Sequence, residues 1–103
     1  YQKSGLAKLN EEVQHSNKLT EERVKQLEAE GKTEEANKAK IDGLKSAQEK
    51  YSQILKIQKT ELEKLGESGD KNSKAYRLQE VRVAQMSTKV SEATRDIKRA
   101  QRH

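Results

Sequence analysis

The sequence predicts an all-α protein built from long helices, and three observations support that fold class. Ala, Glu, Lys, Leu and Arg make up about half of the 103 residues, a share typical of coiled coils and long surface helices. The chain has no Pro and only five Gly, so nothing forbids helices of unusual length. Leu, Ile and Val number only 18, without Phe or Trp, which is too few for a sandwich, a barrel or a doubly wound core. Disordered chains share this shortage, so disorder is the alternative.

The first predicted helix covers residues 6–30. Its candidate contact residues recur at alternating spacings of four and three, which places them in one seam. The seam consists of Leu6, Asn10, Val13, Asn17, Thr20, Val24 and Leu27. The polar stretch 15–18 indicates a break, after which Thr20 would act as an N-cap, with Leu19 packed on Val24.

A turn at Gly31 separates this helix from a second one over residues 34–65. Gly31 can adopt the left-handed conformation that ends a helix, and Thr33 can cap the helix that follows. The seam of the second helix consists of Ile41, Leu44, Gln48, Tyr51, Leu55, Gln58, Leu62 and Leu65. Ala47, Ile54 and Ile57 widen this stripe, whereas Gly43 inside it is expected to weaken the helix by about 1 kcal/mol relative to Ala.

The third predicted helix covers residues 73–102 and follows the only cluster of turn residues, at 66–73. Gly69 is the expected turn residue, and Asn72 and Ser73 are candidate N-caps. The seam of this helix consists of Tyr76, Gln79, Val83, Met86, Val90, Ala93, Ile97 and Ala100.

Three long helices with narrow apolar stripes predict a single coiled-coil unit over residues 1–103. The helices can fold back at Gly31 and Gly69 into an antiparallel hairpin or three-helix arrangement, which is the geometry we expect. The alternative is an extended rod of parallel, self-associated chains. Because the sequence opens at Tyr1 in the middle of the helical pattern, we interpret it as a segment of a larger protein.

The positive charge of the chain is concentrated in its last third. Residues 71–103 hold nine Lys and Arg against three acidic residues, so they carry a net charge of +6. Arg95, Lys98, Arg99 and Arg102 could contact phosphates weakly and in a salt-sensitive manner. No aromatic residue alternates with them to stack on bases, so a solvated helix surface is the preferred interpretation, and sequence-specific nucleic-acid recognition is not predicted.

The sequence contains no recognisable catalytic, cofactor or metal site. The two histidines, His15 and His103, have no Cys or second His near them, and the chain has no Cys at all. Its acidic residues follow the spacing of a helix surface rather than converging on a pocket. We therefore predict a non-enzyme without cofactor or metal, and no apolar run of about 20 residues predicts a membrane span.

Several segments resemble the N-terminal helical region of tail tape measure proteins, which belong to long-tailed phages and prophages of Gram-positive bacteria. The resemblance covers residues 6–100. Its motifs are the runs 9–13 (LNEEV), 19–23 (LTEER), 27–44 (LEAEGKTEEANKAKIDGL), 62–65 (LEKL) and 73–78 (SKAYRL). These motifs are of low complexity, and no residue of this segment is catalytic in that family.

The resemblance implies a virion component that lies in the lumen of the tail tube and is assembled in the host cytoplasm. The length of this component would set the length of the tail. It further implies association with copies of itself, with the tail tube protein and with tail assembly chaperones. The alternative is a generic coiled-coil adaptor or scaffold domain that binds a partner helix. Such an adaptor would expose an apolar patch beyond its seam, for which the candidates are Ile54, Ile57, Leu78 and Val81.

Overall fold

The chain folds into three helices, as the composition and spacing predict. The computed structural model describes residues 5–69 and 73–102. The helices are α1 (Gly5–Ala29), α2 (Thr33–Glu67) and α3 (Lys74–Gln101). Their bounds lie within two residues of the predicted ones, and the described part contains no strand.

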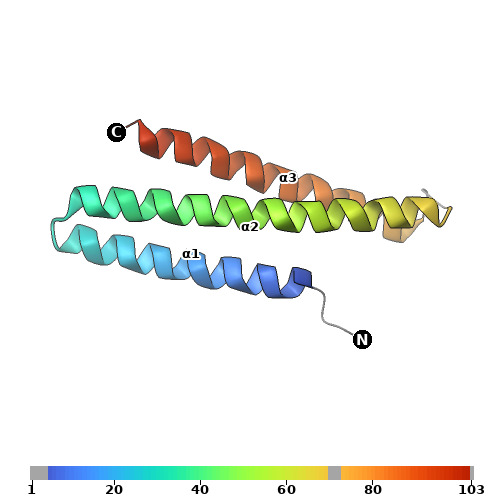
Figure 1. Ribbon diagram of the computed structural model, residues 1–103, viewed down its shortest axis with the longest axis horizontal. Coiled ribbons are helices and arrows are strands. Elements are labelled where there is room, and N and C mark those ends of the chain that lie inside the picture. Colours follow the sequence, from blue (N-terminus) through green and yellow to red (C-terminus); the bar gives the residue numbers. More distant parts are fainter. Residues whose placement is uncertain (1–4, 70–72, 103) are drawn as a thin grey trace.

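Helix α2 lies between the other two, which run antiparallel to it (Figure 1). Both α1 and α3 pack on α2, but within the described residues α1 and α3 do not pack on each other. The molecule measures 58 × 31 × 16 Å along its principal axes, and its length is close to the ~52 Å expected for a 35-residue helix. The structure is therefore the predicted three-helix arrangement and not an extended rod.

The turn between α1 and α2 is closed by Gly31, as predicted. Gly31 has a φ of +79°, which costs a residue without a Cβ little. Its N–H donates to the carbonyl of Glu28, and the N–H of Lys32 donates to the carbonyl of Leu27. This pair of hydrogen bonds is the Schellman motif, so the last carbonyls of α1 are satisfied within the turn.

The predicted N-cap at Thr33 is wrong. The N–H of Ala36 already donates to the carbonyl of Lys32, so Thr33 is the first residue inside α2. Lys32 occupies the cap position and forms no side-chain cap hydrogen bond. The short Schellman turn thus starts the second helix one residue earlier than the sequence suggests. Glu34 and Glu35 in the first turn of α2 still suit the positive end of the helix dipole.

Between α2 and α3 the chain turns at Gly69, whose φ is +110°. Ser73 caps α3 as predicted, because its Oγ accepts a hydrogen bond from the N–H of Tyr76 at 3.1 Å. The other candidate cap, Asn72, lies outside the described residues.

The predicted break at 15–18 is also wrong, since α1 is continuous from Gly5 to Ala29. Asn17 lies within this stretch, and its side chain hydrogen-bonds to Tyr51 of α2, so packing against α2 supports helix where the local sequence is polar. Thr20 is therefore an interior helical residue rather than a cap, and Leu19 is 58% exposed instead of forming a staple with Val24.

The apolar core takes one buried side chain from each helix: Val13, Ile54 and Met86. Ile54 is completely buried at the centre of α2. The half-buried side chains of Leu6, Leu9, Tyr51 and Leu55 pack around these three. This small core fixes the middle of the molecule, whereas the interface residues towards the turn at Gly31 are smaller, as with the buried Ala36 and Ala100.

Candidate functional surfaces

Tyr51 at the middle of α2 connects all three helices. Its hydroxyl accepts a hydrogen bond from Nδ2 of Asn17 on α1 at 3.2 Å. Nζ of Lys89 on α3 lies 5.7 Å from the centroid of the Tyr51 ring, within the range of a cation–π interaction. The sequence placed Tyr51 in the seam, and the structure shows that its ring and hydroxyl serve different neighbours.

Glutamines in the predicted seams form polar contacts between α2 and α3. Nε2 of Gln48 donates to Oγ1 of Thr94 at 2.6 Å, and Nε2 of Gln79 donates to the backbone carbonyl of Gln58 at 3.0 Å. These hydrogen bonds exist only when the two helices are aligned in one register. The side-chain oxygen of Gln58 is buried and has no hydrogen-bond partner in the described part of the chain.

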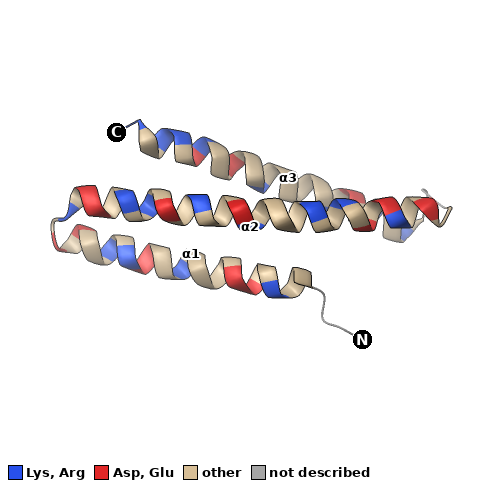
Figure 2. Ribbon diagram, in the orientation of Figure 1, with Lys and Arg blue, Asp and Glu red and all other residues tan. Residues whose placement is uncertain are grey.

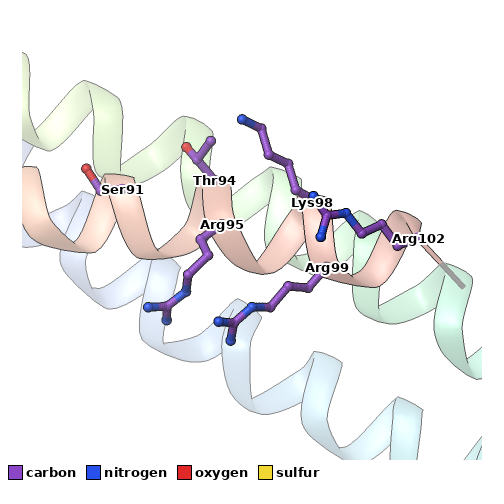
Figure 3. A pocket seen from close by; sticks show the side chains of 6 residues that line it. All are labelled: Ser91, Thr94, Arg95, Lys98, Arg99 and Arg102. Atoms are coloured by element: carbon purple, nitrogen blue, oxygen red, sulfur yellow. The ribbon is translucent and has the colours of Figure 1, made fainter.

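A basic surface covers the last turns of α3, where Figure 2 shows positively charged residues concentrated. We call it the α3 basic surface. It forms an open hollow lined by Ser91, Thr94, Arg95, Lys98, Arg99 and Arg102. In Figure 3, Arg95 and Arg99 extend to one side of the helix, and Lys98 extends to the other. All four cations that the sequence offers as phosphate contacts therefore belong to one continuous surface.

Only one ion pair among the described residues involves the α3 basic surface. Oδ1 of Asp96 lies 3.4 Å from Nε of Arg95. The two other ion pairs within residues 5–69 and 73–102 are Glu22–Lys25 and Glu30–Lys32, both far from this surface in the sequence. Lys98, Arg99 and Arg102 accordingly form no ion pair with any described residue.

The apolar patch expected of an adaptor is only partly exposed. Ile54 is completely buried, contrary to that expectation, because it faces the core that α1 and α3 form with α2. Ile57 is half-buried. Leu78 and Val81 on α3 are 50% and 51% exposed, and their spacing of three places them on one side of the helix.

The structure places His15 on the exposed surface of α1, and His103 lies outside the described residues. Within residues 5–69 and 73–102, no three His, Cys, Asp or Glu side chains come together as metal ligands would. None of the described helices combines the length and the apolar character required to cross a membrane.

One close contact between helices could not be predicted from the sequence. Gly43 on α2 lies directly against Thr20 on α1, so that a Cβ at position 43 would approach Oγ1 of Thr20 to 2.7 Å. A glycine inside a helical pattern indicates such an approach only when the facing residue is known.

The chain matches no protein-family model, no curated protein and no solved structure.

Proposed function

We propose that this chain is a tape-measure-like structural segment of a phage tail, which helps to set tail length and supports tail assembly. The support comes from the motifs within residues 6–100 that resemble the helical region of tail tape measure proteins. In this proposal the segment belongs to a larger protein that occupies the tail tube lumen.

The length of the helices supports the proposal on physical grounds. Helices of 25, 35 and 28 residues account for nearly all of the described chain, and a helix converts residue number into length at ~1.5 Å per residue. Folded as three helices, the chain is 58 Å long, whereas one uninterrupted helix of the same 103 residues would span ~155 Å. A segment that acts through its length would therefore contribute 58 Å if the turns at Gly31 and Gly69 stay closed, and ~155 Å if both turns open into one helix.

The proposed partners are further copies of the same protein, the tail tube protein and tail assembly chaperones. Lys and Glu are distributed along α1 and α2 (Figure 2), and most of them are exposed, which would keep the segment soluble before assembly.

Tail length in a phage that carries this segment tests the proposal. We expect deletion of residues 5–102 in frame to shorten the tail by about 60 Å if the segment acts folded, or by ~150 Å if it acts as a single helix. A matched control replaces the segment with an unrelated helical sequence of equal length. Electron micrographs of both phages measure the tail length. A tail of unchanged length in the deletion phage would contradict a role in length determination.

A second candidate function is an adaptor that binds a partner helix, which the exposed Leu78 and Val81 favour. The parent protein distinguishes the two candidates. A parent of many hundred residues with further helical stretches, encoded among tail genes, supports the tape measure proposal, whereas a parent of ordinary size supports the adaptor.

A further inference from the structure

We propose that the α3 basic surface binds the phosphate backbone of a nucleic-acid duplex, without reading base sequence. The contacts would come from Arg95, Lys98, Arg99 and Arg102, which line one hollow at the end of α3. This proposal is independent of the tape measure assignment, since it concerns only the charge and geometry of this surface.

The cations of this surface are available to an external anion. Lys98, Arg99 and Arg102 are exposed, and no described carboxylate lies within ion-pair distance of them. Arg95 contacts Asp96, but its side chain remains 53% exposed. Cations in the last turn of a helix also favour the negative end of its dipole, yet this effect fades within one turn and does not explain Arg95.

The spacing of the cations suits a row of phosphates. Residues three and four apart lie on the same side of a helix, so positions 95, 98, 99 and 102 form a stripe ~10 Å long. Phosphates follow one another at ~3.4 Å of axial rise on each strand of a duplex, a spacing shorter than the stripe, so each of the four cations can reach a phosphate of one strand or the other. Figure 3 shows Arg95 and Arg99 reaching to one side and Lys98 to the other, which allows contacts along both flanks of the helix.

The neighbouring residues favour a duplex over a membrane. An interfacial helix needs an apolar face to insert into lipid, but Ala93, Ile97 and Ala100 of this part of α3 are already buried against the rest of the protein.

The absence of stacking residues favours a duplex over a single strand. The hollow is lined only by Ser, Thr, Arg and Lys, without an aromatic ring on which unpaired bases could stack. Three of the four cations are Arg, whose planar guanidinium can bind a phosphate through two parallel hydrogen bonds.

Binding of a fluorescently labelled 20-base-pair DNA duplex to the 103-residue chain, followed by anisotropy, tests the proposal. Four phosphate contacts predict that affinity falls about 150-fold when the salt concentration rises fourfold, from 25 to 100 mM. The triple variant Lys98→Gln, Arg99→Gln, Arg102→Gln leaves one contact, so its affinity is expected to fall only about threefold over the same range.

The matched control is Lys56→Gln, Lys59→Gln, Lys64→Gln, which removes the same charge from exposed positions of α2. We expect this control to keep the salt dependence of the unmodified chain. Equal losses in the two triple variants would overturn the proposal, because binding would then follow net charge alone. No detectable duplex binding at 25 mM salt would overturn it as well.

Other probes identify the anion. Equal or tighter binding to a poly-glutamate peptide would assign the surface to an acidic protein, and tighter binding to phosphatidylserine vesicles would assign it to a membrane. Either result overturns the proposal.

The charge-preserving variant Arg99→Lys, Arg102→Lys is expected to retain the salt dependence. Circular dichroism of each variant shows whether it is folded, and the single variants Lys98→Gln and Arg102→Gln, each expected to weaken the salt dependence by about one contact, test the proposal if the triple variant unfolds.

Discussion

Gly43 of α2 lies directly against Thr20 of α1. A Cβ added at Gly43 would lie 2.7 Å from Oγ1 and 3.1 Å from Cβ of Thr20, with Cγ2 of Thr20 closer still. Both residues lie in continuous helix, and Thr20 is branched at Cβ, so rotation of its short side chain exchanges one close atom for another. The glycine therefore permits α1 and α2 to pack at their present separation.

The first prediction concerns this contact. Although Ala is favoured over Gly in a helix interior by about 1 kcal/mol, we expect Gly43→Ala to lower the free energy of unfolding by about 1–2 kcal/mol, because overpacking outweighs helix propensity. In the background of Thr20→Ala, which removes the two nearest atoms, the same substitution should become neutral or stabilising. Urea unfolding of the four proteins of this double-mutant cycle measures the coupling. Stabilisation by Gly43→Ala alone would contradict the close packing.

The second prediction concerns the turn at Gly31. Its φ is +79°, and a Cβ added there would meet no other atom within 4 Å, so Gly31→Ala should destabilise through backbone conformation alone, by about 1–2 kcal/mol. Gly31→Asn should cost less, since Asn tolerates the left-handed region better. In a continuous helix the alanine variant would instead gain about 1 kcal/mol, so a rise in the thermal unfolding midpoint would contradict the turn.

The third prediction concerns Gln58, whose buried side-chain oxygen lacks a hydrogen-bond partner in the described part of the chain. Gln58→Leu removes this oxygen and keeps most of the side-chain volume, so it should stabilise the fold by about 1 kcal/mol. Gln53→Leu, at an exposed position of the same helix, is the control and should change stability by less than about 0.5 kcal/mol. Chemical denaturation measures both, and a destabilised Gln58→Leu would show that the oxygen is satisfied.

The fourth prediction concerns the two connections between helices. Both turn glycines are exposed, but only residues 30–32 join α1 to α2, where the two hydrogen bonds of the Schellman motif close the turn, whereas the longer stretch 68–73 joins α2 to α3. A protease of broad specificity should therefore cut first within residues 66–73 and only later near residue 31. Mass spectrometry of the earliest fragments locates the cuts. First cuts inside residues 76–97 would mean that α3 is not stably packed.

The sequence predicts the buried residues more completely for α3 than for α2, for a geometric reason. Every seam residue predicted for α3 is buried or half-buried, because α3 packs on one neighbour and one stripe suffices. Helix α2 packs on two neighbours and needs a wider stripe, so its buried residues include Ala47 and Ile54, which the sequence already placed beside the seam, and Ala36, which it did not. The number of neighbours is a tertiary property, which the spacing within one helix does not contain.

The features of the candidate functional surfaces likewise differ in whether the sequence could predict them. The cations of the α3 basic surface could be read from the sequence, because their spacing of three and four defines a helical stripe. The contacts of Tyr51 with Asn17 and Lys89 could not, since they depend on the register in which three separate helices meet. The capping role of Ser73 was predictable because a cap involves only neighbouring residues, and the failure at Thr33 came from a turn one residue shorter than expected.

Small-angle X-ray scattering of the 103-residue chain, extrapolated to zero concentration, tests the central claim that the chain folds back at Gly31 and Gly69. The three-helix structure has a Cα radius of gyration of 17.1 Å and a longest extent of 58 Å. We expect a measured radius of gyration slightly above this value, because scattering includes side chains and bound water. A single extended helix of ~155 Å would give about 45 Å, and a value near that figure would contradict the fold-back and favour the rod.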